Sequence, residues 1–468
     1  MPETVAVVGA GLVGCLTAIA LAKRDYKVTL FDYRLDPRDQ KTIDRNLRSI
    51  NLAISSRGIT SLEFVDKEVA GRVLKGIIPM KGRMIHHLNG AQESQTYGLF
   101  GESINSIDRA VLNHLLLDEL ERIGSDKVQV KFGHKLSKIK YGKPDEFQSC
   151  VFTTEEGVDQ VYATNFVVGC DGSYSTTRDQ MQREVRMHFS QEYIDCCYIE
   201  LYIPPSKNYD ARYKGNFSLA PDHLHIWPRH QYMLIALANA DGSFTSTFFG
   251  PWGLVESLLK SEARVREFLS KNFPDAMEIM GINQAVKSFM SHPKGALMCI
   301  ECDPYNVSGG RGIILGDAAH SMVPFYGQGM NCGFEDVKVL MKLLDAYDGD
   351  RAKAFDAYTR ERHQDLTAIV KLAKRNYKEM SHDVTSKVFL LRKKLDHWLG
   401  KLLKDKWLPL YTMVSFRADI PYHKAIAISK RQKTILDFIQ VLIIAAISLL
   451  GYEGFKRVSR RLKQASRQ

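Results

Sequence analysis

The sequence has few of the residues that mark a disulfide-rich or zinc-binding protein. Its 468 residues include only eight cysteines. The one C-x-x-C pair, Cys299 and Cys302, has no second pair and no histidine partner at zinc spacing. We therefore expect free thiols, a reducing compartment and no metal site. The chain also shows no signal-peptide pattern, because a β-branched apolar run begins at Val5.

Net positive charge is small over most of the chain, although the net charge of the whole chain is +11. Residues 424–468 contain ten Lys or Arg against two acidic residues, a surplus of +8, which leaves +3 for residues 1–423. A protein that binds duplex nucleic acid spreads its Lys and Arg over a folded face. Here the surplus flanks one apolar stretch instead. We therefore expect no nucleic-acid partner.

The start of the chain predicts a strand–helix–strand unit. Residues 4–8 and 27–31 are short apolar runs typical of buried parallel strands, and residues 12–23 between them have helical spacing. Two strands joined by a helix within so short a stretch form a βαβ unit, the element on which dinucleotide-binding sheets are built.

The first turn of this unit carries the pattern G-x-G-x-x-G, formed by Gly9, Gly11 and Gly14. The first glycine allows the tight turn, the second lets a pyrophosphate approach the backbone, and the third lets the helix pack on the strand. The free N–H groups of the helix start face the phosphates. Asp32, at the end of the second strand, is placed to accept hydrogen bonds from a ribose diol. The pattern favours a bound dinucleotide.

Two further turns indicate a flavin dinucleotide. Asp171 and Asp317 each lie in a glycine-containing turn that follows an apolar strand, which suits a long ligand stretched across the sheet ends. We expect Asp317 to reach the ribityl hydroxyls. Gly329, Met330 and Asn331 open a helix whose N-terminus can stabilise negative charge on a reduced flavin ring. No second G-x-G-x-x-G is present, so we expect no dedicated NADPH site of that type.

These elements, in this order, resemble the class A single-component FAD-dependent aromatic hydroxylases. The resemblance implies FAD as cofactor, NADPH and O2 as co-substrates, and oxygen transfer through a C4a-hydroperoxyflavin. It also implies that Arg109 meets the FAD pyrophosphate, whereas from the residues alone Arg109 reads as a solvated charge at a helix start. Because the cofactor carries the difficult chemistry, we expect no catalytic triad. The segment Pro324, Phe325 and Tyr326 is placed to exclude water beside the flavin, or is simply core.

Four less common stretches resemble the kynurenine hydroxylase family within this class. They are residues 49–53, 79–86, 223–229 and 323–331. The resemblance extends over nearly the whole chain. It implies 3-hydroxylation of L-kynurenine, in tryptophan degradation and de novo NAD synthesis.

The same resemblance implies roles for individual residues. Arg83 would pair with the amino-acid carboxylate of the substrate, a task suited to a guanidinium, and Tyr97 would hydrogen-bond the same group. Further substrate contacts would come from Asn376 and Tyr411. The remaining implied FAD contacts are Val13, Asp32, Arg34, Ala53, Leu136, Met330 and Asn331. Each substrate residue also has a plain structural interpretation: a surface charge for Arg83, core aromatics for the two tyrosines and a capping or packing amide for Asn376.

We expect an α/β fold with a Rossmann-like FAD-binding lobe, an inserted antiparallel-sheet substrate lobe, a C-terminal helical region and a hydrophobic tail helix. Residues 185–250 alternate between apolar and polar side chains, as antiparallel strands do, and residues 333–405 read almost entirely as helix. The expected divisions are 1–180 and 301–345 for the FAD lobe, 181–300 for the substrate lobe, 346–430 for helices lining the substrate pocket, and 431–468 for the tail.

The tail is mostly apolar over residues 435–452. Its continuous part, residues 441–452, is shorter than the roughly 20 residues of a full membrane span. Basic residues flank both of its sides, as at a membrane surface, and no polar face runs through residues 441–447. We expect membrane attachment rather than a core or dimer-contact helix, and a homodimer stays open. The resemblance implies the mitochondrial outer membrane, with the catalytic body facing the cytosol.

Two other functions stay open at this stage. One is a different FAD-dependent aromatic hydroxylase or epoxidase on the same scaffold. The other is a non-enzymatic FAD-bound membrane adaptor. NADPH consumption coupled to a hydroxylated product separates them, because the first would respond to a different aromatic compound and the second to none.

Overall fold

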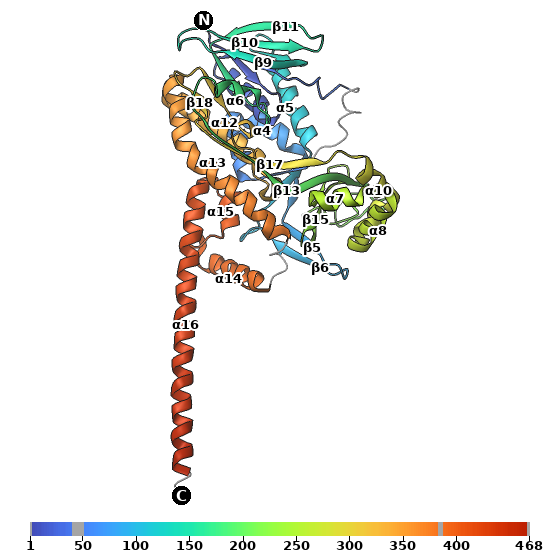
Figure 1. Cartoon of the computed structure of the whole chain (residues 1–468), viewed down its shortest axis with the longest axis vertical. Coiled ribbons are helices and arrows are strands. Elements are labelled where there is room, and N and C mark those ends of the chain that lie inside the picture. The colour runs from blue at the N-terminus through green and yellow to red at the C-terminus, as the bar shows by residue number, and fades with distance from the viewer. Residues whose placement is uncertain (1, 40–50, 382–386, 466–468) are drawn as a thin grey trace.

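The computed structural model describes residues 2–39, 51–381 and 387–465. They form a body of sheets and packed helices from which the last helix, α16 (Tyr422–Ala465), projects (Figure 1). Within the stretch 49–53 that carries part of the family resemblance, Ser49 and Ile50 lie outside the described residues.

A six-stranded sheet forms the centre of the nucleotide-binding lobe. Five of its strands are parallel, and the sixth, β18, pairs antiparallel at one edge. In spatial order the strands are β18 (Asn306–Val307), β19 (Gly312–Ile314), β12 (Phe166–Gly169), β1 (Thr4–Val8), β2 (Lys27–Phe31) and β8 (Val128–Lys131). The central strands are almost wholly buried, as their continuous apolar runs predict.

Helix α1 (Leu12–Ala22) follows β1, as the sequence predicts. It packs on β1 and β2 and contacts two further helices, α5 (Arg109–Ile123) and α12 (Gly329–Ala346). A Cβ atom at Gly14 would lie 1.8 Å from the carbonyl oxygen of Gly9. Only glycine therefore lets the helix begin this close to the turn, which confirms the packing role expected of the third glycine.

A seven-stranded sheet makes up the second lobe. All neighbouring strands in it are antiparallel except β14 and β5, which run parallel. In spatial order they are β17 (Gly295–Asp303), β13 (His188–Ile203), β16 (Phe244–Gly250), β15 (Tyr232–Ala238), β14 (His223–Arg229), β5 (Gly82–His86) and β6 (Gln92–Thr96). Strands β13 to β16 are the antiparallel strands that the alternating pattern of residues 185–250 predicts.

This lobe differs from the expected residues 181–300 in its strands. Strands β5 and β6 come from the segment assigned to the first part of the FAD lobe. The parallel pairing of β5 with β14, which aligns Ile85 with Ile226, joins segments far apart in sequence. An alternating pattern fixes which side chains face the core, but it does not name the partner strand.

Four helices that the strand pattern does not predict also belong to this lobe. They are α7 (Trp252–Leu258), α8 (Glu262–Asn272), α9 (Pro274–Met280) and α10 (Ile282–Ser291). Apolar residues such as Val286 and Phe289 of α10 pack with Trp227 and Phe248 of the sheet in a core of their own. The helices therefore cover sheet side chains that would otherwise face water.

Two three-stranded sheets and several short helices complete the N-terminal two-thirds. One sheet contains β9 (His134–Lys140), β10 (Gln148–Thr154) and β11 (Asp159–Thr164). The other contains β3 (Leu52–Ile54), β7 (Ile104–Ile107) and β4 (Ile78–Met80). The short helices are α3 (Ser56–Val65), α4 (Lys67–Val73), η1 (Leu74–Gly76), α6 (Thr176–Met181), α11 (Asp317–His320) and η2 (Pro324–Tyr326).

The C-terminal region is helical, as predicted, but it is broken by turns. After α12 come α13 (Arg351–Ser381), α14 (Lys387–Leu403), η4 (Lys404–Lys406), α15 (Leu410–Phe416) and α16. The break between α12 and α13 contains Asp348 and Gly349, whose φ angles are +51° and +81°. A right-handed helix cannot continue through such angles, so the expected stretch of 333–405 is interrupted there.

Helix α16 is long and apolar enough to cross a membrane. The candidate span is Tyr422–Lys456, with a mean hydropathy of 2.2 in its most apolar window and 6% of that window buried. Figure 1 shows this helix extending away from the body. Its exposed apolar side chains are not covered by the described part of the chain.

A buried chain of polar groups fixes β5 in the seven-stranded sheet. His225 Nε2 lies 2.8 Å from the carbonyl oxygen of Ala220, and its Nδ1 lies 2.8 Å from His86 Nε2. His86 Nδ1 lies 3.0 Å from Asp275 Oδ2, which also accepts from Trp227 Nε1 at 2.8 Å. Burial lowers the pKa of His225 to about 3, so this ring is neutral.

The protonation of this chain follows from its acceptors. His225 must donate from Nε2 to a carbonyl, so its Nδ1 accepts the Nε2–H of His86. Burial alone would raise the pKa of Asp275, but the hydrogen bonds from His86 and Trp227 lower it, so the carboxylate is ionised. His86 therefore donates from Nε2 to His225, and its Nδ1 lies against the ionised carboxylate of Asp275.

Stability should depend on pH through His225. The folded-state pKa of His225 lies below the ordinary value of 6.5. As the pH falls below 6.5, His225 therefore becomes protonated in the unfolded chain but stays neutral in the folded chain, which favours unfolding. The free energy of unfolding should fall by about 1.4 kcal/mol between about pH 7.5 and pH 5.5. We expect the fall in the thermal unfolding midpoint between these pH values to be smaller in His225→Gln than in the wild-type chain. His188→Gln, at an exposed position, is the matched control. Equal falls in His225→Gln and the control would contradict this assignment.

Candidate active site

A cavity of about 360 Å³ lies where the two lobes and the C-terminal helices meet. Its size is in the range of small-molecule sites. The glycine turn, β3, strands of the seven-stranded sheet and the segment from Asp317 to Met330 all contribute to its wall. Of the residues expected at the site, the following line it: Gly11, Val13, Ala53, Arg83, Tyr97, Arg109, Asp317, Pro324, Phe325, Tyr326, Gly329, Met330 and Tyr411.

The glycine turn has the shape that a pyrophosphate requires. Gly9 has a φ of +101°, and a Cβ there would lie 2.4 Å from the carbonyl oxygen of Cys170. Gly11, by contrast, has an ordinary φ of −76°, and its Cβ would meet no atom within 4 Å. The protein itself thus leaves room for a side chain at Gly11. Open space in front of a helix N-terminus is the space that a bound phosphate fills.

Asp32 lies at the end of β2, where the sequence predicts it, and it is buried. Its Oδ2 accepts from the N–H of Ala10 at 2.8 Å, and its Oδ1 accepts from the N–H of Arg34 at 2.9 Å. The guanidinium of Arg34 also donates to both carboxylate oxygens. Neither residue lines the cavity itself. The pair stands beside the glycine turn, where Asp32 fixes the turn and Arg34 remains half exposed.

Arg109 and Asp317 reach the cavity from helix N-termini. Arg109 is the first residue of α5, and the preceding Asp108 caps the helix by accepting from the N–H of Ala110 at 2.7 Å. Asp317 begins α11 after Gly316, whose φ is +60°. An arginine suits the phosphates of a flavin dinucleotide, and an aspartate suits the hydroxyls of its polyol chain.

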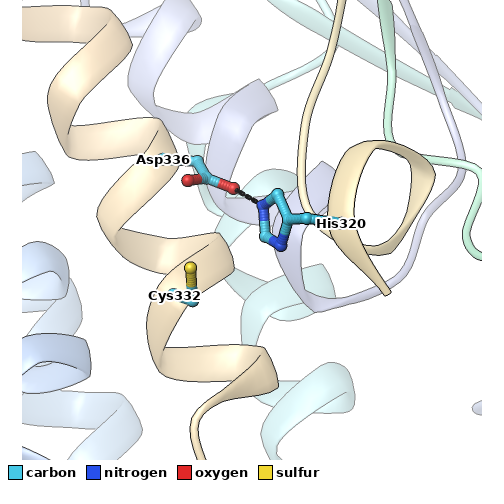
Figure 2. Close-up of side chains that lie close together, drawn as sticks. All are labelled: His320, Cys332 and Asp336. Carbon is cyan, nitrogen blue, oxygen red and sulfur yellow. Dashed lines mark hydrogen bonds and ion pairs between the residues drawn. The ribbon is translucent and has the colours of Figure 1, made fainter. Parts of the chain in front are cut away.

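A buried ion-pair network holds the Gly316 turn in place. Asp336 of α12 accepts from the N–H of Gly316 at 3.1 Å, from Arg362 Nε at 2.9 Å, and from His320 (Figure 2). Burial would raise the pKa of Asp336, but the charges of His320 and Arg362 lower it. The carboxylate is therefore ionised and joins α11, α12 and α13.

His320, Cys332 and Asp336 lie close enough together to resemble a metal-binding cluster (Figure 2). The guanidinium of Arg362 lies within hydrogen-bond distance of both Asp336 and the Cys332 sulfur. A permanent positive charge at that position repels a cation. Burial also raises the pKa of the Cys332 thiol well above its usual value, which opposes the thiolate that a metal requires. The cluster is better explained as a structural ion pair.

The side chain of Asn331 forms its hydrogen bonds with backbone groups of the protein and does not line the cavity. Its Oδ1 accepts from the N–H of Ser55 at 2.8 Å, and its Nδ2 donates to the carbonyl oxygens of Ala53 and Gly327 at 2.8 and 2.7 Å. These bonds tie the start of α12 to β3. The start of a helix carries a partial positive charge, and Gly329 and Met330 bring the start of α12 to the cavity wall.

Arg83, Tyr97 and Tyr411 form an aromatic–cationic group at one end of the cavity. Arg83 is 4% exposed. Its guanidinium carbon lies 5.6 Å from the ring centre of Tyr97 and 5.2 Å from that of Tyr411. The two tyrosine rings stack at 5.3 Å, and Tyr326 stacks on Tyr411 at 5.6 Å. Burial raises the pKa of the Tyr97 hydroxyl, so it remains a hydrogen-bond donor.

Two expected contact residues lie behind the wall. Asn376 is 2% exposed and donates from Nδ2 to the carbonyl oxygen of Phe325 at 2.6 Å, so it supports the Phe325 segment and does not line the cavity. Leu136 belongs to β9 and is buried in the main core, also outside the lining. For Asn376, the structure favours the packing-amide interpretation.

The wall also contains residues that the sequence does not single out. Tyr198, Leu237 and Phe249, from β13, β15 and β16, supply apolar surface. Their alternating pattern shows that they face one side of the sheet, but it does not show which side meets the flavin lobe. The contact between this sheet and η2, in which the ring of Phe249 lies 5.2 Å from that of Phe325, is visible only in the fold.

A second cavity of about 180 Å³ shares Arg83, Tyr97 and Tyr411 with the first. Its other wall includes Arg392, Asp396 and His397 of α14. The three shared side chains therefore form the partition between the larger cavity and a smaller space lined by α14.

Comparison with known proteins agrees with this geometry. Residues 3–373 match the FAD binding domain family. The chain is 58% identical over 98% of its length to the kynurenine 3-monooxygenase of Saccharomyces cerevisiae, covering 99% of that protein, and 55% identical over 96% to that of Candida albicans, covering 96%. Among solved structures it resembles 2-methyl-3-hydroxypyridine-5-carboxylic acid oxygenase (TM-score 0.64, 18% identity, 83% of this chain and 95% of that one). It also resembles p-nitrophenol 4-monooxygenase from Pseudomonas putida (TM-score 0.63, 17% identity, 86% and 95%).

The two glycines of the turn should respond differently to substitution. Gly11→Val places its side chain in open space, so the chain should fold but lose FAD. Gly14→Val drives a side chain into the Gly9 carbonyl and should prevent folding. Visible flavin absorbance per protein and far-ultraviolet circular dichroism measure the two effects. A folded Gly11→Val protein with full FAD content would contradict the placement of the pyrophosphate.

Proposed function

The chain belongs to the kynurenine 3-monooxygenase family of FAD-binding proteins, and on this premise we propose that it converts L-kynurenine to 3-hydroxykynurenine with NADPH and O2. It is an FAD-dependent monooxygenase. The observation that carries the substrate proposal is the buried guanidinium of Arg83, flanked by Tyr97 and Tyr411, in the wall of the cavity.

Arg83 is suited to bind the amino-acid carboxylate of the substrate. A guanidinium forms two parallel hydrogen bonds with a carboxylate, and these bonds are strong where water is excluded. The protonated hydroxyl of Tyr97 adds a donor to the same group. A substrate with one carboxylate and one aromatic ring would then extend its ring along the cavity toward the flavin end.

The apolar wall supplies the dry surroundings that the reaction needs. FAD, when bound, accepts a hydride from NADPH and activates O2 for transfer to the substrate ring. Phe325 and Tyr326 lie at the cavity, and Asn376 holds their segment through the Phe325 carbonyl. Because solvent access would let the activated oxygen be lost as hydrogen peroxide before it reached the ring, the task of these side chains is exclusion of water rather than acid–base catalysis.

The start of α12 has an electrostatic task. Gly329 and Met330, at the start of this helix, line the cavity, and the side-chain bonds of Asn331 fix the helix start there. A helix N-terminus stabilises negative charge placed against it. The flavin ring acquires such charge on reduction, so this helix start favours the reduced cofactor.

We also propose that α16 anchors the enzyme in the mitochondrial outer membrane, with the body in the cytosol. The support is a helix with a mean hydropathy of 2.2 whose apolar side chains are exposed, with basic residues on both sides. A helix of this composition is stable in water only if another surface covers it. A lipid bilayer provides that surface.

Product analysis tests the proposed activity. The purified yellow protein, incubated with L-kynurenine, NADPH and air, should yield a product heavier than kynurenine by one oxygen atom, with NADPH consumed in proportion. Mass spectrometry identifies the product and absorbance follows NADPH. Rapid turnover of another aromatic acid with no response to kynurenine would overturn the substrate. No substrate-dependent oxidation of NADPH at all would overturn the reaction.

Substitution of Arg83 tests the carboxylate site. Arg83→Ala should raise the KM for kynurenine about 10- to 100-fold, since a charge-assisted hydrogen bond contributes about 1.5–3 kcal/mol. FAD content should not change, because Arg83 belongs to β5 of the seven-stranded sheet and not to the glycine turn. Lys81→Ala removes an exposed cation from the same region and is the control. An unchanged KM in Arg83→Ala would remove Arg83 from the site.

The anchor is tested by truncation. The full chain should stay with the mitochondrial outer membrane after alkaline extraction, whereas a chain ending at Asp437 should be released. Protease added to intact mitochondria should digest the body if it faces the cytosol. Release of the full chain by alkali would contradict the anchor, and protection of the body would contradict its orientation.

A further inference from the structure

Helix α14 has one face fixed against the body. A Cβ at Gly400 would lie 2.7 Å from the Leu99 side chain, so the helix packs closely at this point. Trp407 Nε1 donates to Asp396 at 3.1 Å, which holds the same face. The rotation of α14 about its axis is therefore set by contacts within the protein.

The opposite face of α14 is apolar and exposed. Leu395, Trp398 and Leu402 are 41%, 60% and 62% exposed. They follow each other at helical spacings of three and four, so they form one stripe. A stripe with two leucines and a tryptophan on a fixed helix is unfavourable in water and indicates a covering surface.

The position of α14 identifies that surface. Arg392 of α14 lies 3.7 Å from Asp437 of α16, and Asp437 lies one helical turn before the continuous apolar part of the candidate span, residues 441–452. Figure 1 shows α14 beside α16, running across its direction, on the side of the body from which α16 projects. A helix lying across the anchor at the start of its apolar segment is at the depth of the lipid headgroups.

Charge around the stripe fits a lipid surface. Exposed lysines accompany it at Lys394, Lys401, Lys404 and Lys406. Exposed basic residues also precede the apolar part of α16, at Lys430, Arg431 and Lys433. Basic residues around an apolar helix face, with tryptophan among the apolar residues, are typical of helices that lie in the surface of an anionic membrane.

We propose that α14 is a second membrane contact, which lies in the headgroup region of an anionic bilayer with Leu395, Trp398 and Leu402 buried among the acyl chains. This inference rests on the proposed anchoring by α16. It places the inner face of α14, which supplies Arg392, Asp396 and His397 to the second cavity, directly above the lipid. The partition of Arg83, Tyr97 and Tyr411 then separates the larger cavity from a space bounded by the membrane-bound helix.

Tryptophan fluorescence in vesicles tests the contact. The full chain is reconstituted in phosphatidylcholine–phosphatidylserine vesicles with or without bromine on the acyl chains, because bromine quenches tryptophan only on contact. We expect brominated lipid to quench the wild-type protein more than Trp398→Phe. Trp252→Phe, which removes a tryptophan of α7, should be quenched as the wild type is. The double variant Leu395→Gln, Leu402→Gln should lose the Trp398 quenching and still float with the vesicles through α16.

Each outcome separates the two proposals. A chain that floats with the vesicles but is quenched equally in wild type and Trp398→Phe overturns the contact by α14 and leaves the anchor intact. A chain that fails to float overturns both. A second copy of the chain covering the stripe would shield Trp398 from bromine and would appear as a dimer by mass in detergent, which also overturns the lipid contact.

Discussion

The buried guanidinium of Arg57 joins the FAD-binding lobe to the C-terminal helices. Arg57 leaves α3 and donates to the carbonyl oxygens of Met413, Val414, Arg417 and Ile420, which lie at the end of α15 and before α16. It also pairs with Glu335 of α12 at 2.8 Å and lies over the Tyr422 ring at 4.0 Å. Only a side chain with five donors in a planar fork meets so many acceptors at once. Without it, several backbone carbonyls and a carboxylate would be buried with unsatisfied hydrogen-bonding capacity.

The charge of Arg57 continues into a network that reaches the glycine turns. Glu335 also pairs with Arg362 at 2.8 Å, and Arg362 pairs with Asp336, which holds the Gly316 turn. Buried ion pairs add little net stability, because desolvation offsets their attraction, but loss of one partner costs about 3–5 kcal/mol. Such a network acts mainly on specificity: it allows one arrangement of α3, α12, α13 and α15 and penalises the others. The cavity lies inside that arrangement, so the positions of Tyr411 and the Asp317 turn are linked.

Local patterns in the sequence were sufficient for the parts of the fold that local physics decides. The strands at residues 4–8 and 27–31, the helix between them and the tight approach at Gly14 all follow from neighbours in sequence. The parallel pairing of β5 with β14 does not, because the cost of closing a long loop is repaid only by the completed sheet. Asn376 shows the same limit in the site. Its motif resembles that of a substrate contact, but its hydrogen bond to Phe325 depends on the crossing of α13 over η2, which no local pattern records.

The position of Arg83 links the proposed chemistry to the proposed membrane contacts. Arg83 lines both cavities, so a carboxylate bound there stands at the partition, with the substrate ring toward the flavin and its charged end toward α14. Kynurenine is a zwitterion and does not partition into lipid, so the membrane cannot serve as its reservoir. An anionic bilayer beneath α14 would instead act on the positions of the protein's helices. By fixing α14 and α16, it would hold the wall that α14 supplies around the charged end of the substrate. The anchor would then contribute to the shape of the site as well as to the location of the enzyme.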